Sequence, residues 1–406
     1  MRFLSRPLIV VILVSALAGG QELSGYHEDE QLNIGYQSLE VDHTPKPTQR
    51  SGLIRSGLTA SAAEVPSAEE RMPASGEPDP RIDPSPSLTI GVHMDLTWDT
   101  DPERRHRALR SAEHVLGSEL SKHSLLWHLI EPTRGNRDWS VVDAVVDGSI
   151  AAGMDVLFDV RGSPAWASRA SPKSDPDAYL FVPSQPTDQR VWLDHWADFL
   201  EEAASRYGDR VRYWTLWGEP NQHFNFKPRP DLELYKRMYV AGYAAIKDAA
   251  PNALVAPGSL TALSAQYPGD IEGFTFLTEL FASNLPMDAI AISPYTAHSP
   301  DEHVVWENNF DDIGRLPDLM RRYGVAVPVW VLEWGWSESE VGEAQQAEYI
   351  GRSLEILTDR YPFVTIACVF MDADRPGLFD YGLLTQDFAP KLAAAAFARF
   401  TSVHSR

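Results

Sequence analysis

A (β/α)8 barrel is the fold class that the sequence predicts for residues 87–402. Two observations predict it. Short apolar runs rich in β-branched residues alternate with amphipathic helical segments, and eight such runs fit within the residues available. Eight strand-helix units suit this fold, which commonly takes about 200 to over 400 residues. An open doubly wound sheet is the weaker alternative, because no glycine-rich phosphate-binding fingerprint follows the first strand.

The expected strands are short and strongly apolar. They are Leu88–His93, Leu120–Trp127, Met154–Val160, Val211–Trp217, Leu254–Pro257, Ala289–Ser293, Val327–Glu333 and Val364–Phe370. Helices are expected between them. One is marked by apolar residues at helical spacing before a stop at Gly208, namely Trp192, Trp196, Phe199, Leu200 and Ala203. Another has one apolar face, formed by Ala347, Ile350, Leu354 and Leu357.

The residues before the barrel divide into two segments. Residues 1–18 have the pattern of a signal peptide: Arg2 and Arg6 precede the apolar run Leu8–Leu17, and Ala16-Leu17-Ala18 fits a cleavage site. An uncleaved anchor is the alternative, although the apolar run is short for a membrane span. Residues 19–86 are rich in Ser, Pro, Gly, Glu and Gln without a periodic pattern, which predicts a disordered linker. We therefore expect a secreted or periplasmic protein whose mature chain has no integral membrane span.

Composition excludes several functions. The net charge is −22, with 35 Lys and Arg against 57 Asp and Glu, so nucleic acid and anionic membrane surfaces are not expected partners. Cys368 is the one cysteine, which excludes an intramolecular disulfide and a Cys/His metal set. Its apolar neighbours predict a buried small hydrophobic side chain. No metal or organic cofactor is expected. Oligomeric state is not readable from the sequence.

Two glutamates stand where catalytic groups gather on a barrel. Glu219 follows the fourth expected strand and Glu333 ends the seventh, and each is flanked by tryptophan. An unpaired buried carboxylate is costly, so two of them at strand ends suggest a task. Active sites of these barrels lie at the carboxyl ends of the strands, so both side chains should project into one cleft. Each residue could instead cap a helix or pair with an arginine.

A pair of carboxyl groups in a cleft can cleave a glycosidic bond. One protonates the leaving oxygen, and in retaining enzymes the other attacks the anomeric carbon from about 5–5.5 Å away. Burial beside Trp217 and the charge of Glu333 should raise the pKa of Glu219. Glu333 should stay ionised, and Tyr295 is the expected hydrogen-bond donor to it.

Several segments resemble clan A glycoside hydrolases, and family 39 most closely. Tyr213–Asn221 is similar to the acid/base signature of that clan, and Val331–Trp336 is similar to its nucleophile strand. Support comes also from Trp127–Pro132 and Gly162–Ala167, so the resemblance spans about Ser87–Phe400. Family 39 includes β-xylosidases and bacterial exopolysaccharide-cleaving enzymes. The resemblance implies a retaining mechanism with Glu219 as acid/base and Glu333 as nucleophile.

Three positions depart from the clan pattern. Gly218 replaces the asparagine that precedes the acid/base, Ser293 replaces a histidine before Tyr295, and Lys122 takes the place of an arginine. The family asparagine holds the sugar 2-hydroxyl. We therefore expect Gly218 to leave room for a sugar that is bulkier or differently substituted at C2.

Further residues are candidates for binding sugar. Aromatic rings stack well on sugars, and the expected platforms are Trp127, Trp166, Trp334 and Trp336, with Trp217 as either core or site. Asn221 is a possible donor to the sugar. Asp95, His128 and His298 either bind hydroxyls or are ordinary loop and core polar residues.

The sequence thus predicts an exported retaining glycosidase that acts on a poly- or oligosaccharide. The alternative is a catalytically inactive carbohydrate-binding or polysaccharide-assembly barrel, which the three departures motivate. A polysaccharide lyase is less favoured, because it needs a Tyr, His or Lys base beside a cation that neutralises charge.

Overall fold

A computed structural model describes residues 88–404 apart from 172, 262, 265–267 and 306. The predicted signal peptide and linker, residues 1–18 and 19–86, lie outside the described residues. In the described part, no helix combines the length and the apolar character that crossing a membrane requires.

Eight parallel strands form one sheet, and all eight overlap the predicted runs. Their bounds are β1 Thr89–His93, β2 Leu120–Leu126, β3 Asp155–Arg161, β4 Tyr213–Leu216, β5 Leu254–Pro257, β6 Ile290–Ile292, β7 Val329–Val331 and β8 Val364–Phe370. The hydrogen-bonded order runs β5-β4-β3-β2-β1-β8-β7-β6. Between the two end strands, a parallel bridge joins Leu260, just after β5, to Ile292 of β6. The sheet is therefore a nearly closed barrel, as the alternating pattern predicts.

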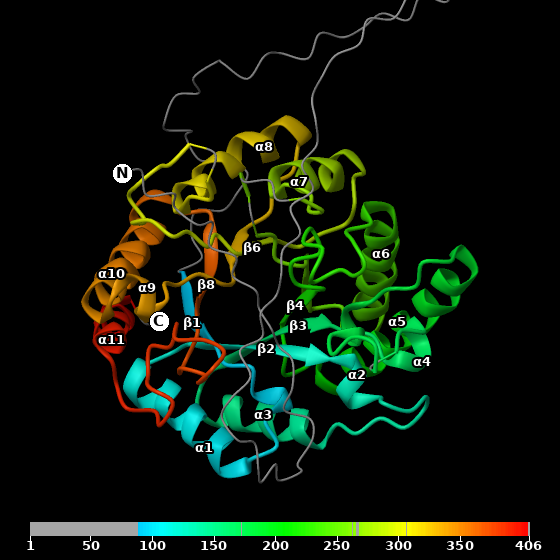
Figure 1. The fold of residues 1–406 in the computed structure, drawn as a ribbon, viewed down its shortest axis with the longest axis horizontal. Coiled ribbons are helices and arrows are strands. Elements are labelled where there is room, and N and C mark those ends of the chain that lie inside the picture. Colours follow the sequence, from blue (N-terminus) through cyan, green and yellow to red (C-terminus); the bar gives the residue numbers. More distant parts are fainter. Residues whose placement is uncertain (1–87, 172, 262, 265–267, 306, 405–406) are drawn as a thin grey trace, which may run out of the picture. The chain divides into compact units, whose positions relative to one another are not determined.

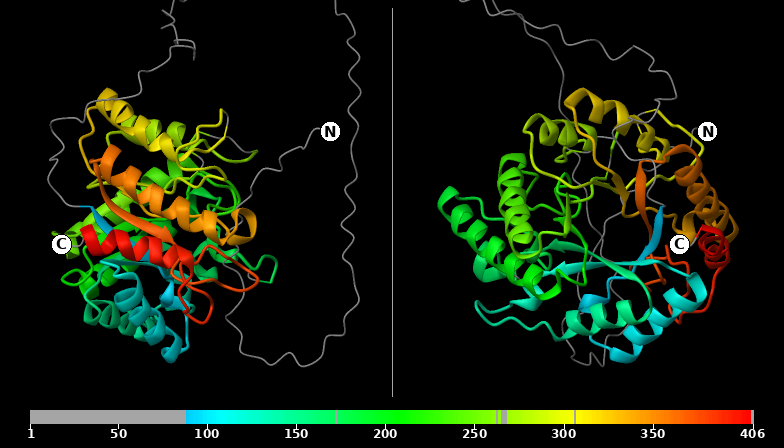
Figure 2. Two further views of the ribbon diagram at one scale, coloured as in Figure 1. Left: turned by 90° about the vertical axis from the view of Figure 1, so that its left-hand side faces the viewer. Right: turned by 180° about the vertical axis from the view of Figure 1, so that it is seen from behind.

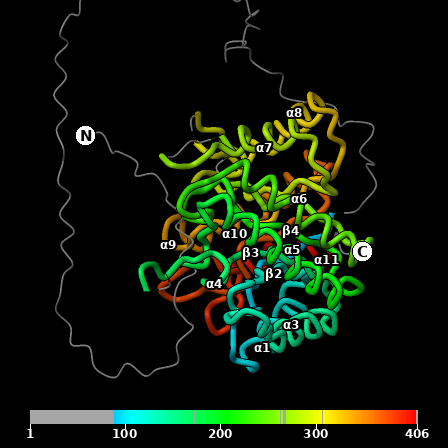
Figure 3. Tube along the Cα trace, turned by 90° about the vertical axis from the view of Figure 1, so that its right-hand side faces the viewer, coloured from blue at the N-terminus to red at the C-terminus, as the bar shows by residue number. Residues whose placement is uncertain are grey.

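Helices surround the strands (Figure 1). The longer ones are α1 Pro102–Ser111, α3 Ser140–Ala151, α5 Pro186–Tyr207, α6 Leu232–Ala249, α7 Gly273–Ala282, α8 Leu316–Tyr323, α10 Glu343–Arg360 and α11 Leu392–His404. Short helical turns at α2 Trp127–Ile130, α4 Ala165–Ser168 and α9 Glu338–Val341 follow strands β2, β3 and β7. Figure 2 shows the orange helix α10 and the red helix α11 lying side by side, and Figure 3 shows α7 close to α8.

Local sequence explains where these helices begin and end. The side chain of Asp101 accepts a hydrogen bond from the backbone N–H of Glu103 at the start of α1, and Asp231 caps α6 in the same way through Leu234. Gly324, with φ of 67°, ends α8 in the left-handed conformation that glycine adopts without strain. The predicted stop at Gly208 is confirmed as the end of α5.

Apolar side chains fill one part of the barrel interior. This inner cluster draws on several strands and comprises Leu120, Leu157, Tyr213, Ala256, Ala289, Ala291, Trp330, Leu332, Ile366 and Cys368. The rings of Tyr213 and Trp330 meet edge to face at 5.6 Å. Cys368 is fully buried, as predicted. Alternate residues of a strand face the interior. The next inward-facing residues therefore lie between this cluster and the carboxyl ends of the strands.

Candidate active site

Polar side chains replace apolar ones toward the carboxyl ends of the first four strands. His93 on β1 is the ladder neighbour of Lys122 on β2, and Asp159 on β3 is the neighbour of Thr215 on β4. Ladder neighbours in parallel strands face the same side of the sheet, so each pair points the same way. All four residues are buried.

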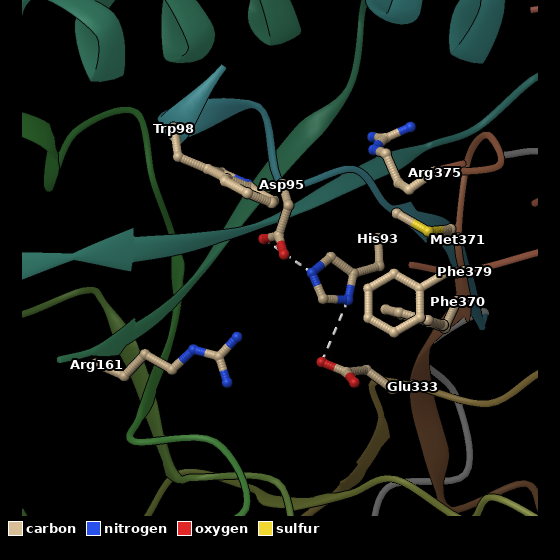
Figure 4. A pocket seen from close by; sticks show the side chains of 9 residues that line it. All are labelled: His93, Asp95, Trp98, Arg161, Glu333, Phe370, Met371, Arg375 and Phe379. Carbon is tan, nitrogen blue, oxygen red and sulfur yellow. Dashed lines mark ion pairs between the residues drawn. The ribbon is translucent and has the colours of Figure 1, made fainter. Parts of the chain in front are cut away.

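Glu333, two residues beyond β7, is held by three side chains. The Lys122 ammonium lies 2.5 Å from Glu333 Oε1, and Nδ1 of His93 lies 3.2 Å from the same oxygen. The hydroxyl of Tyr295 donates to Oε2 at 3.2 Å, as predicted. The other ring nitrogen of His93, Nε2, lies 2.9 Å from Oδ1 of Asp95. Figure 4 shows this Asp95–His93–Glu333 series.

These contacts keep Glu333 ionised. Burial alone would raise its pKa, but Lys122 and His93 outweigh burial and hold the pKa of Glu333 well below the ordinary value. The partners respond in the opposite sense. Burial would lower the pKa of Lys122 and of His93, yet their carboxylate neighbours raise both. An ionised carboxylate at neutral pH is the form that can act as a nucleophile.

Glu219 lies on a tight turn that follows β4. Trp217 and Glu219 have φ angles of 67° and 54°, in the left-handed region that non-glycine residues rarely adopt. The Glu219 backbone N–H donates to the carbonyl of Ser259, at 2.7 Å. A Cβ on Gly258 would lie 1.7 Å from the carbonyl oxygen of Trp217, so only glycine allows this approach. The segment after β5 therefore fixes where Glu219 points.

The surroundings of Glu219 favour its protonated form. The amide of Asn225 donates to Oε2 of Glu219 at 2.5 Å, and Glu219 is 4% exposed. Burial, and secondarily the negative charge of Glu333, raise the pKa of Glu219 to about 8. Glu219 can therefore hold a proton at neutral pH while Glu333 does not, which is the division of roles that paired carboxyl groups need.

The space beside Gly218 is filled. A Cβ at this position would meet Oδ2 of Asp159 at 2.4 Å, and Oδ1 of Asp159 accepts a hydrogen bond from Thr215 at 2.8 Å. The expectation that Gly218 leaves open room for a bulkier sugar is therefore wrong. The Asp159 carboxylate, supplied by the neighbouring strand, occupies that room.

A small hollow that opens to solvent lies beside Glu333. Charged side chains and aromatic rings both line it: His93, Asp95, Trp98, Arg161, Glu333, Phe370, Met371, Arg375 and Phe379 (Figure 4). Among the residues the structure describes, no group of three or more His, Cys, Asp or Glu is placed to hold a metal ion.

Asn221 does not reach the hollow as a donor. Its amide nitrogen donates to the backbone carbonyls of Thr261 and Ile271, at 2.8 and 3.0 Å. Asn221 therefore ties the loop after β4 to the loop after β5. His298 lies on the loop after β6, where it contacts Glu307 at 2.7 Å, and it is not among the residues that line the hollow.

The tryptophans expected to stack on sugar lie mainly in the core. Trp127, Trp334 and Trp336 are at most 2% exposed, and their indole N–H groups donate to Glu131, Ser353 and the carbonyl of His298. Their burial places them between the barrel and its helices rather than on a platform. Trp166 is half-buried against Trp127 and donates to the carbonyl of Glu131. Trp217 is also fully buried.

Sequence reasoning missed much of the site. His93, Arg161 and Asn225 were not singled out, and Trp98 on the loop after β1 lines the hollow in place of the expected tryptophans. A signal was present for the first two. Polar residues recur at every second position near the ends of apolar strands, as in His93-Met94-Asp95 and Asp159-Val160-Arg161. That period places them all on the inner face of the barrel.

Comparisons with known proteins support the fold. No protein-family model matches the chain, and no curated protein matches it. Several solved structures do match the chain. A family 39 glycoside hydrolase from Bacteroides cellulosilyticus is 22% identical, with a TM-score of 0.58 over 80% of this chain and 65% of its own. The chain thus spans less than two thirds of that enzyme.

Two further structures agree with this match. A GH39 enzyme from Xanthomonas axonopodis pv. citri is 18% identical, with a TM-score of 0.59 over 82% of this chain and 69% of its own. A monomeric β-xylosidase from Caulobacter crescentus is 18% identical, with a TM-score of 0.58 over 82% and 70%. At these identities the likeness concerns the fold. In its fold, the chain resembles family 39 glycoside hydrolases and other clan A enzymes, as its two glutamate segments predict.

Proposed function

We propose that this chain is an exported, retaining glycoside hydrolase. Glu219 protonates the leaving oxygen as general acid, and Glu333 attacks the anomeric carbon to form a glycosyl-enzyme intermediate. Glu219, now ionised, then removes a proton from the water that releases the sugar. The substrate is a poly- or oligosaccharide. Export rests on the sequence pattern of residues 1–18.

The observation that carries this proposal is that two buried glutamates have side-chain contacts of different charge. Glu333 has a lysine and a histidine in contact, whereas Glu219 has a neutral amide donor. Their pKa values are shifted in opposite directions. The likeness in fold to family 39 glycosidases supports the same interpretation.

The test compares the unaltered chain with Glu333→Gln on a panel of poly- and oligosaccharides. Release of reducing ends should fall by about 10⁴-fold or more in the variant, the scale seen when a nucleophile is removed. Binding of the same polymers should persist, because the amide preserves the shape of the side chain. Undiminished turnover would remove Glu333 from the mechanism. Binding without turnover by the unaltered chain would favour the inactive carbohydrate-binding alternative.

A further inference from the structure

Arg161 is a buried cation that lacks a close anionic partner. It ends β3, is 6% exposed, and lines the hollow beside Glu333. Its Nη2 donates to the hydroxyl of Ser124 at 3.3 Å, and its Nε lies 4.0 Å from Oδ2 of Asp159, beyond hydrogen-bond distance. Within the part of the chain that the structure describes, Nε has no hydrogen-bond partner.

Two other arginines with little exposure, Arg137 and Arg375, lie closer to carboxylates than Arg161 does. Arg137 contacts Glu131, Asp198 and Glu202 at 2.9, 2.6 and 2.5 Å. Arg375, on the same hollow, contacts Asp372 at 3.1 Å and donates to two backbone carbonyls. A buried cation is costly unless carboxylates or other acceptors satisfy it, so Arg161 stands apart.

Each carboxylate near Arg161 has a closer partner than Arg161, although Oδ2 of Asp159 faces the guanidinium at 4.0 Å. Glu333 is bound by Lys122, and Asp95 by His93. Asp159 accepts from Thr215. Figure 4 shows the Arg161 guanidinium pointing into the hollow, toward the side on which Glu333 lies. Trp98 also lines the hollow, and its buried indole Nε1 has no hydrogen-bond partner among the described residues.

A guanidinium matches a carboxylate in both charge and geometry, because its planar fork binds two oxygens in parallel. We propose that Arg161 binds the carboxylate of a uronic acid residue in the substrate, on the sugar that occupies the hollow beside Glu333. This inference rests on the proposed function for its position and adds the substrate class, an acidic polysaccharide.

The test uses matched polymers. Glucuronoxylan, polygalacturonate, alginate and hyaluronan are each compared with their carboxyl-reduced counterparts, which keep the backbone and lose the charge. Binding to Glu333→Gln is measured by calorimetry, and reducing-end release is measured with the unaltered chain. At least one acidic polymer should bind about 10–100-fold more tightly than its reduced form, as expected for a hydrogen bond to a charged group.

Variants then assign the effect. Arg161→Gln should remove the preference for the acidic polymer and leave binding of the reduced polymer little changed, and Arg161→Lys should restore part of it. Arg169→Gln removes an exposed positive charge that does not line the hollow and should keep the full preference. The comparison of polymers on the unaltered binding site stands even where an Arg161 variant does not fold.

The outcomes separate the two proposals. Equal or tighter binding of the reduced polymers overturns the assignment of Arg161, and so does an equal loss of binding of both kinds of polymer in Arg161→Gln. If the unaltered chain still cleaves a neutral polymer, the proposed hydrolase function stands. Arg161-dependent binding of an acidic polymer without release of reducing ends supports the assignment and contradicts the hydrolase. Binding of none of the acidic polymers overturns the assignment.

Discussion

At the scale of single residues, the site depends on which charges touch which glutamate. Lys122 and His93 both contact Oε1 of Glu333. Glu219 instead accepts a hydrogen bond from the neutral amide of Asn225 at one of its oxygens. Two residues of the same type therefore differ in protonation because their environments differ.

Lys122→Met should raise the pKa of Glu333, since the largest cationic influence on that carboxylate is lost. The acid limb of the kcat/KM profile should move to higher pH, and the maximal rate should fall by about 10²–10³-fold, as when an electrostatic partner is removed. Lys122→Arg is the matched control, because it keeps the charge. An acid limb at the same pH in Lys122→Met would show that the lysine does not control Glu333.

A second residue-scale prediction concerns Gly218 and Asp159. Gly218→Asn should lower activity and stability, because its Cβ would lie 2.4 Å from the Asp159 carboxylate. Asp159→Ala in the same chain should recover part of this loss, since it vacates the space. Thermal unfolding and kcat/KM of both single variants and the double variant give the coupling. Additive effects would mean that the two positions do not share that space.

At the scale of elements, strands were predictable and the turn that carries Glu219 was not. All eight strands follow from short apolar runs, which depend on local sequence. The positive φ angles of Trp217 and Glu219 run against their own preferences, and the contact with Gly258 after another strand helps to fix them. Local patterns do not report such a contact. The same holds for Trp127, Trp334 and Trp336, whose burial depends on the helices that cover them.

Gly258→Ala should therefore disturb the turn and the acid/base together. The added methyl would sit 1.7 Å from the Trp217 carbonyl oxygen, so the backbone must shift, at a cost of about 1–3 kcal/mol for overpacking. Gly351→Ala, within α10, is the control, because its nearest neighbouring atom is 3.8 Å from the new Cβ and alanine favours a helix. The melting temperature, measured by differential scanning calorimetry, and kcat should both fall in Gly258→Ala only. Full activity in Gly258→Ala would contradict the role of this contact.

At the scale of the whole molecule, the catalytic pair links folding to pH. Unfolded glutamate ionises near its ordinary pKa, whereas burial keeps the proton on folded Glu219 up to about pH 8. Between these values the folded state binds more protons than the unfolded state, so stability falls as pH rises through this interval. Glu333 has the opposite shift, and its contribution is lost only at acid pH, below the ordinary value.

Glu219→Gln should remove the decline in stability that ionisation of Glu219 causes. Its free energy of unfolding should exceed that of the unaltered chain by more at pH 8–9 than at pH 5, with a difference of the order of 1 kcal/mol or more. Glu201→Gln, on an exposed position of α5, should show no such difference. The same substitution of Glu219 should also abolish the alkaline limb of kcat/KM and lower kcat by about 10²–10⁴-fold. Parallel stability curves for Glu219→Gln and the unaltered chain would contradict the raised pKa.

The most direct test of the account is capture of the covalent intermediate on Glu333. A 2-deoxy-2-fluoro glycoside with an activated leaving group, built on the sugar that the polymer panel identifies, should add the mass of one glycosyl unit to the unaltered chain. Peptide mass spectrometry should place that unit on Glu333, and Glu333→Gln should remain unmodified. Attachment at another residue, or a first product with inverted anomeric configuration, would contradict a retaining mechanism through Glu333.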